Sequence, residues 1–176
     1  CLEIFRDDNC DVYSGFSTCI EDCKGNKVQF IFMPEPRKSD YIRESVEETN
    51  KAIKSSITEF IDGVSINNDI RDYRIVIYHG EIKGCVYPNG EQASSPIAVT
   101  KEQFMSMKAD YYACGHIHLP VEVFDKCWYA APPYPCNFGE LHEGCYNLVT
   151  IDNGNTSVER ISLGLPSNIV VEHSIQ

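Results

Sequence analysis

The segment Asp110-Tyr111-Tyr112-Ala113-Cys114-Gly115-His116-Ile117-His118 places two histidines directly after a short apolar run and a glycine. Such a run predicts a buried strand, and residues two apart on an extended segment point the same way. His116 and His118 can therefore converge where the strand ends. A second apolar run, residues 75–78 in a strand predicted at 74–78, is also followed directly by a histidine, His79. Two strands that deliver histidines predict a site at the carboxyl edge of a sheet, where open α/β sheets place their chemistry.

Strands and helices alternate around these two runs. Residues 28–32 are rich in β-branched and aromatic side chains and predict a strand. Apolar residues at helical spacing predict a helix over residues 41–62, with Ser39 or Asp40 as its N-cap and Gly63 just after its end. Thr100 and Gln103 have the spacing of a capping box, which predicts a short helix reaching residue 108.

The remaining segments indicate a long loop and several short strands. Residues 80–98 are rich in Gly, Pro, Ser and Asn and predict the loop. Further strands are predicted at 110–114, 121–124, 126–130, 146–151 and 156–161. Strands alternating with helices, followed by antiparallel strands, predict an α/β (α+β) fold with a mixed sheet and helices outside it.

Composition narrows the class of protein. The chain has 176 residues with 43% hydrophobic content, enough for one domain with a real core, and a net charge of −11. That charge argues against a broad basic surface for nucleic acid. The nine cysteines include no Cys-x-x-Cys pair, so we expect reduced thiols in a cytoplasmic protein. No apolar run approaches the roughly 18 residues of a membrane span, so we expect no membrane partner.

The three strand-end histidines, His79, His116 and His118, are the candidate metal ligands. Neutral imidazole binds zinc, iron and other transition metals. The three could hold one ion with an open position, or form half of a two-metal site whose bridging carboxylates come from elsewhere. His142 and His173 are predicted to be surface or structural histidines. Glu81 and Glu140 lie near the edge of the predicted site, and we expect both to belong to a solvated face.

Gly115-His116-Ile117-His118, preceded by Asp110-Tyr111-Tyr112-Ala113, resembles the Gly-His-x-His motif of calcineurin-like metallophosphoesterases. His79-Gly80 is similar to the upstream single-histidine motif of that superfamily. The likeness is strongest to the DNA-repair exonuclease branch of Mre11/SbcD type, and it covers roughly residues 28–151. Residues 28–34, 128–132, 137–140 and 146–151 are its supporting segments. Ala130-Ala131 stands where that branch usually has Gly-Ser.

The resemblance implies a fold and an activity. The fold would be part of a four-layer α-β-β-α sandwich with mixed sheets. Residues 1–164 would be the C-terminal portion of the metallophosphoesterase domain, and 165–176 a tail or edge strand. Two divalent ions, manganese in the first place with iron or zinc as alternatives, would activate a hydroxide that attacks phosphorus. His79 and His116 would share one ion and His118 would bind the other. DNA, an SMC-like ATPase and a second copy of the chain are the implied partners.

The first metal motifs of that family, Asp-x-His, Gly-Asp and Gly-Asn-His, do not occur here. Because each follows a strand, we expect roughly 60–100 further residues of a longer polypeptide to carry them. We therefore expect the 176-residue chain alone to be inactive. Two alternatives stay open: a phosphodiesterase or phosphatase for small substrates, and a non-catalytic metal-binding adaptor.

Overall fold

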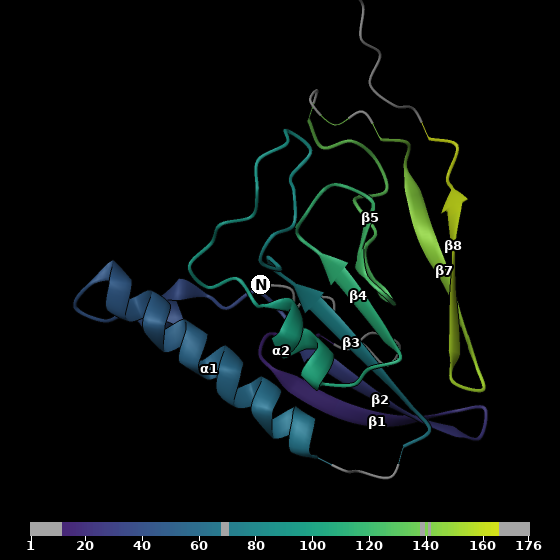
Figure 1. Ribbon diagram of the computed structural model, residues 1–176, viewed down its shortest axis with the longest axis horizontal. Coiled ribbons are helices and arrows are strands. Elements are labelled where there is room, and N and C mark those ends of the chain that lie inside the picture. Colours follow the sequence, from purple (N-terminus) through teal and green to yellow (C-terminus); the bar gives the residue numbers. More distant parts are fainter. Residues whose placement is uncertain (1–11, 68–70, 138–139, 141, 166–176) are drawn as a thin grey trace, which may run out of the picture.

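The computed structural model describes residues 12–67, 71–137, 140 and 142–165 of the chain, and a mixed six-stranded sheet forms its centre (Figure 1). The strand order is β1-β2-β3-β4-β6-β5. β2, β3, β4 and β6 run parallel, and β1 and β5 are antiparallel at the two edges. The strands are β1 (Ser17–Cys23), β2 (Asn26–Met33), β3 (Tyr73–His79), β4 (Tyr111–Gly115), β5 (Val121–Phe124) and β6 (Cys127–Tyr129). The predicted mixed α/β class is confirmed.

A second sheet is the hairpin of β7 (Cys145–Asp152) and β8 (Asn155–Ser162), whose side chains contact Tyr111 of β4 and Trp128 of β6. Tyr112 points toward α2 (Lys101–Ser106), where its hydroxyl donates to the Phe104 carbonyl. The next side chain along the strand, Tyr111, points the opposite way, and its hydroxyl accepts a hydrogen bond from the Asn147 side chain. The hairpin therefore covers part of the sheet face opposite the helix.

Helix α1 (Val46–Ile66) differs at both ends from the predicted helix. Ser45 caps it by accepting from the Glu48 backbone N–H, whereas Ser39 and Asp40 lie in a separate 3-10 turn, η2 (Lys38–Tyr41). Gly63 is predicted to follow the end of the helix but lies inside it. Val64 continues the buried apolar stripe, and the helix extends to Ile66. The capping box of α2, Thr100 with Gln103, is confirmed.

The helices cover one face of the six-stranded sheet, and the main core lies between the helices and the sheet (Figure 1). Alternate residues of the central strands point into it, and α1 contributes apolar residues at helical spacing. The described part of the chain forms three layers, and it has no helix outside the hairpin that would make a fourth. The buried residues of this core include Ile31, Met33, Ile53, Ile57, Ile61, Val76, Tyr78, Phe104, Tyr112 and Tyr129.

All cysteines that the structure describes carry free thiols, as the sequence predicts. The sulfurs of buried Cys114 and Cys127 lie 3.7 Å apart, far beyond the roughly 2.05 Å of a disulfide bond. Within the described helices, none is long and apolar enough to span a membrane. His173 and nearly all of the predicted tail at 165–176 lie outside the described residues.

Candidate metal centre

Three parallel strands end at the same edge of the sheet and bring together side chains from distant parts of the sequence. The register pairs His79 of β3 with Gly115 of β4, and Met33 of β2 with Tyr78. Glu35 follows β2 and His116 follows β4, so both reach the edge where His79 lies. One ligand atom from each of Glu35, His79 and His116 lies within 4.8 Å of the others. The His79 and His116 rings stand almost perpendicular, with centroids 5.5 Å apart.

Glu35 is a candidate ligand that sequence reasoning missed. Its Oε2 lies 3.8 Å from His116 Nδ1, too far for a hydrogen bond. Nitrogen and oxygen ligands at about 2.0–2.2 Å from one ion lie roughly 2.9–3.5 Å apart. The observed separation is only slightly larger, so a small rotation of the exposed Glu35 side chain suits a shared ion. The signal in the sequence is a carboxylate two residues after the strand, between Pro34 and Pro36.

The backbone at the end of β4 is specialised. A Cβ atom on Gly115 would lie 3.0 Å from His79 Nδ1, so the glycine gives the imidazole room beside the strand. The left-handed conformation falls on His116, whose φ is 99°. A non-glycine residue held there costs about 1–3 kcal/mol, and such strain is concentrated at functional sites. Close approach is thus the reason for a glycine at position 115.

The electrostatics favour a neutral His79. Partial burial lowers the pKa of His79, and the adjacent His116 lowers it further, while Glu35 opposes the change. A second imidazole this close disfavours the protonated form of His79. A neutral ring keeps one nitrogen lone pair, which is what binding a metal requires.

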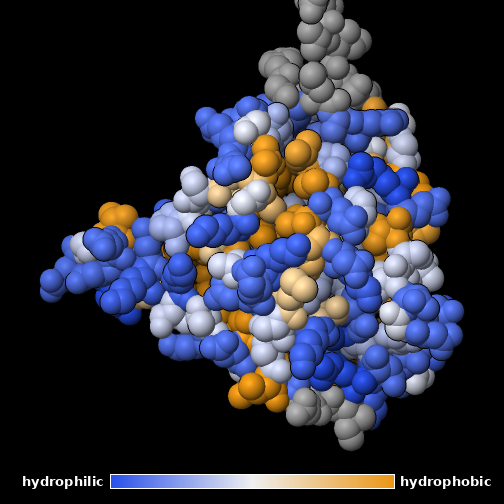
Figure 2. All heavy atoms as spheres, in the orientation of Figure 1, coloured by the Kyte–Doolittle hydropathy of each residue, from blue (hydrophilic) through white to orange (hydrophobic). Residues whose placement is uncertain are grey.

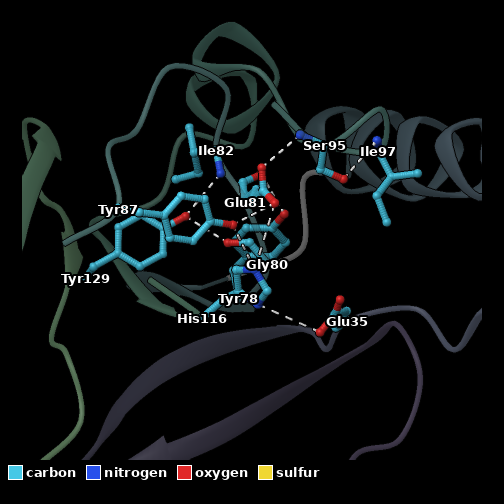
Figure 3. A network of polar contacts seen from close by, with 10 residues as sticks. All are labelled: Glu35, Tyr78, Gly80, Glu81, Ile82, Tyr87, Ser95, Ile97, His116 and Tyr129. Atoms are coloured by element: carbon cyan, nitrogen blue, oxygen red, sulfur yellow. Dashed lines mark hydrogen bonds and ion pairs between the residues drawn. The ribbon is translucent and has the colours of Figure 1, made fainter. Parts of the chain in front are cut away.

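The prediction that Glu81 belongs to a solvated face is wrong, because the loop after β3 folds back over it. Only 15% of its side chain is exposed. One carboxylate oxygen accepts from the Tyr87 hydroxyl at 2.8 Å and the other from the Ser95 backbone N–H at 2.9 Å (Figure 3). Burial and the Glu81 hydrogen bond raise the pKa of Tyr87 to about 12. Tyr87 therefore stays protonated, with its hydroxyl oxygen 3.4 Å from His116 Nε2.

Two buried tyrosines fix the backbone that follows His79. The Tyr129 hydroxyl donates to the Gly80 carbonyl at 2.8 Å and accepts from the Ile82 N–H at 3.0 Å. The Tyr78 hydroxyl donates to the Glu81 carbonyl at 2.9 Å. These bonds, several of which are visible in Figure 3, hold the start of the loop against the core. Tyr129 is a core residue, since none of it is exposed.

A second group of possible ligands surrounds His118. It joins His118, Cys136 and Glu140, whose ligand atoms lie within 4.8 Å of one another. The expectation of a solvated face is wrong for Glu140 as well, because protein donors replace water around its carboxylate and only 2% of the residue is exposed. His142 is buried as a structural histidine would be: 7% of its side chain is exposed, and its Nε2 lies 3.7 Å from Glu140 Oε2.

A cavity of about 710 Å³ connects the two groups, because both His116 and His118 line it. No lysine or arginine is among the described residues that line this cavity. Figure 2 shows a largely hydrophilic face on which apolar side chains gather at the upper middle, in the region of the loops after β3 and β4. The cavity lining is Tyr87, Pro88, Asn89, Glu91, His116, His118, Asn137 and Glu140.

No protein-family model matches the chain, and no curated protein matches it. The donor set itself is nevertheless suited to divalent transition ions, because imidazoles and carboxylates converge beside a cavity. Of the three predicted ligands, His79 and His116 lie together with Glu35, and His118 belongs to a second group that shares a cavity with His116.

Proposed function

We propose that this chain binds two divalent metal ions as part of a metal-dependent phosphodiesterase. The supporting observation is the convergence of Glu35, His79 and His116 at the carboxyl edge of parallel strands, within 4.8 Å of one another. In this proposal these three residues hold one ion, and His118, from the other side of the cavity, binds the second. The resemblance of the Gly-His-x-His segment to metallophosphoesterases agrees with this division of ligands.

The residues of the chain have distinct tasks in such a site. Bound ions supply a water-derived nucleophile and neutralise phosphate charge. His79 and His116 offer nitrogen lone pairs, and Glu35 adds negative charge to the same group. Tyr87 stays protonated beside His116, where its hydroxyl group contributes polarity without adding charge. Mixed nitrogen and oxygen ligands suit manganese, iron and zinc, and manganese is the ion that the resemblance implies.

The cavity favours a small phosphodiester as a second candidate substrate beside DNA. Nucleic acid binding depends on lysine and arginine side chains that neutralise phosphates. The described cavity lining carries none of these, and it includes the carboxylates of Glu91 and Glu140. DNA ends remain the substrate that the resemblance implies, and an SMC-like ATPase partner would then supply the basic surface.

The test is hydrolysis of bis(p-nitrophenyl) phosphate and of linear duplex DNA by the complete protein, with Mn²⁺. We expect His79→Ala and His116→Ala each to lower turnover by about 100-fold or more, since loss of even a supporting partner of a metal ligand costs 10–100-fold. His173→Ala is the matched control and should leave turnover unchanged.

The outcomes separate the hypotheses. Unchanged turnover in both His79→Ala and His116→Ala would remove the metal assignment. Cleavage of the small diester without cleavage of DNA would select the small-substrate phosphodiesterase. Metal binding without hydrolysis of either substrate would select the non-catalytic adaptor.

We also propose a cytoplasmic location. The free thiols of the described cysteines support it, since pairs such as Cys114 and Cys127 stay unoxidised in a reducing compartment.

A further inference from the structure

The geometry points to a positioning role for Glu140: its carboxylate holds His118 by Nδ1 and so directs the Nε2 lone pair to the cavity. The use of that lone pair for a metal rests on the proposed function, whereas the orientation of the ring does not. The residue comes from the loop between β6 and β7, far from His118 in sequence.

The contact between the two side chains is a hydrogen bond. His118 Nδ1 and Glu140 Oε1 are 2.7 Å apart, the length of a charge-assisted hydrogen bond. Both Glu140 oxygens already accept hydrogen bonds, from His118 and Asn137 on Oε1 and from Cys136 on Oε2, so the carboxylate is engaged by the protein. Glu35 differs, because its Oε2 lies 3.8 Å from His116 Nδ1 and makes no hydrogen bond to it. We therefore interpret Glu140 as a carboxylate that positions a histidine and Glu35 as a candidate metal ligand.

The hydrogen bond decides which nitrogen of His118 carries the proton. The Glu140 carboxylate accepts from the Cys136 N–H on Oε2 and from the Asn137 side-chain amide on Oε1, so both of its oxygens act as acceptors. His118 Nδ1, on the same Oε1, is therefore the donor. In the neutral ring the lone pair is then on Nε2, the nitrogen available to the cavity that His118 lines.

Glu140 is itself held in place, which a positioning residue requires. The backbone N–H of Cys136 donates to its Oε2 at 2.7 Å, and the Asn137 side-chain amide donates to its Oε1 at 2.6 Å. His118, in contrast, has 41% of its side chain exposed. Without a fixed partner, an imidazole this exposed would be free to rotate and to exchange tautomers. The buried Glu140 carboxylate therefore fixes the orientation of the His118 ring, which packing around the exposed ring does not.

The test reads the tautomer of His118 directly, from long-range ¹H–¹⁵N spectra of the chain without metal near neutral pH. We expect the wild type to show a protonated Nδ1 and an unprotonated Nε2. Free neutral histidine prefers the opposite tautomer, so Glu140→Ala should shift His118 toward protonated Nε2. Glu140→Gln, which keeps an acceptor oxygen, should restore part of the wild-type signal. Glu91→Gln removes a charge from the same cavity and should leave the tautomer unchanged.

A wild-type His118 with protonated Nε2, or a tautomer unaffected in Glu140→Ala, would overturn the inference. Glu140→Gln is close in shape to the wild type, so it keeps the test meaningful if the alanine variant does not fold. A Mn²⁺ titration of the same samples tests the proposed function separately. If the wild type binds Mn²⁺, Glu140→Ala should weaken the affinity of the His118 ion by about 10–100-fold. Absence of Mn²⁺ binding in a wild type with protonated Nδ1 would contradict the function and leave the positioning intact.

Discussion

At the scale of single residues, two neighbouring positions at the end of β4 bring the imidazoles of His79 and His116 together. Gly115 leaves room for the His79 ring, and His116 takes the left-handed backbone conformation that turns its side chain back toward that ring. A pattern of histidines after apolar runs predicts this convergence. The pattern does not predict the carboxylates, because whether Glu81 and Glu140 face water depends on loops that fold over them.

Burial alone would raise the pKa of Glu140, but hydrogen bonds from the Cys136 N–H and from His118 outweigh it and hold the pKa below its usual value. This lowered pKa predicts how the stability of the protein responds to acid. A carboxyl whose pKa is lower in the folded state than in the unfolded state stabilises the fold at pH values above its unfolded-state pKa. That stabilisation is lost as the pH falls through the folded-state pKa. At pH 7 we expect Glu140→Gln to be about 1.5–3 kcal/mol less stable, the contribution of hydrogen bonds to a charged group. Urea unfolding at a series of pH values should show the two curves converging below about pH 4. Parallel curves over the whole range would contradict the shift.

At the scale of elements, the loop between β6 and β7 is constrained by its closing glycine. A Cβ on Gly144 would lie 1.8 Å from the Pro133 carbonyl oxygen, a backbone atom that cannot move aside without displacing the loop. Gly144 thus lets the segment before β7 pass close to the segment after β6. Glu140 lies between these two points, so the position of the bracing carboxylate depends on this close approach.

We predict that Gly144→Ala destabilises the protein by about 1–3 kcal/mol, as overpacking does, and disturbs the His118 tautomer described above. Gly63→Ala is the matched control, because Gly63 lies inside α1 with nothing within 4 Å of its missing Cβ. That change should stabilise the protein by about 0.5–1 kcal/mol, since alanine restricts the unfolded chain and favours helix. Thermal unfolding of both variants gives the comparison, and a Gly144→Ala variant as stable as the wild type would contradict the packing argument.

At the scale of the whole molecule, the sequence predicts the order of elements well because hydrophobic periodicity is a local property. The strands at 28–32 and 74–78 and the capping box at Thr100 all appear in the structure. The start of α1 is less predictable, since Ser39, Asp40 and Ser45 are all good N-caps and it is Ser45 that accepts the capping hydrogen bond, from the Glu48 N–H. The grouping of His79 with Glu35 depends on the register between β2 and β3. That register cannot be predicted from either segment alone.

The central claim is that His79 and His116 share a divalent ion, and calorimetric titration of the chain with Mn²⁺ tests it most directly. Wild type and His173→Ala should show the same saturable binding. His79→Ala and His116→Ala should each weaken the affinity by at least about 10–100-fold, since each removes a lone pair from one ion. Glu35→Gln should weaken it too, because it removes the negative charge of the group, whereas Glu44→Gln on the exposed surface should not. Equal Mn²⁺ affinity in the wild type and in a His79→Ala/His116→Ala double variant would contradict the claim.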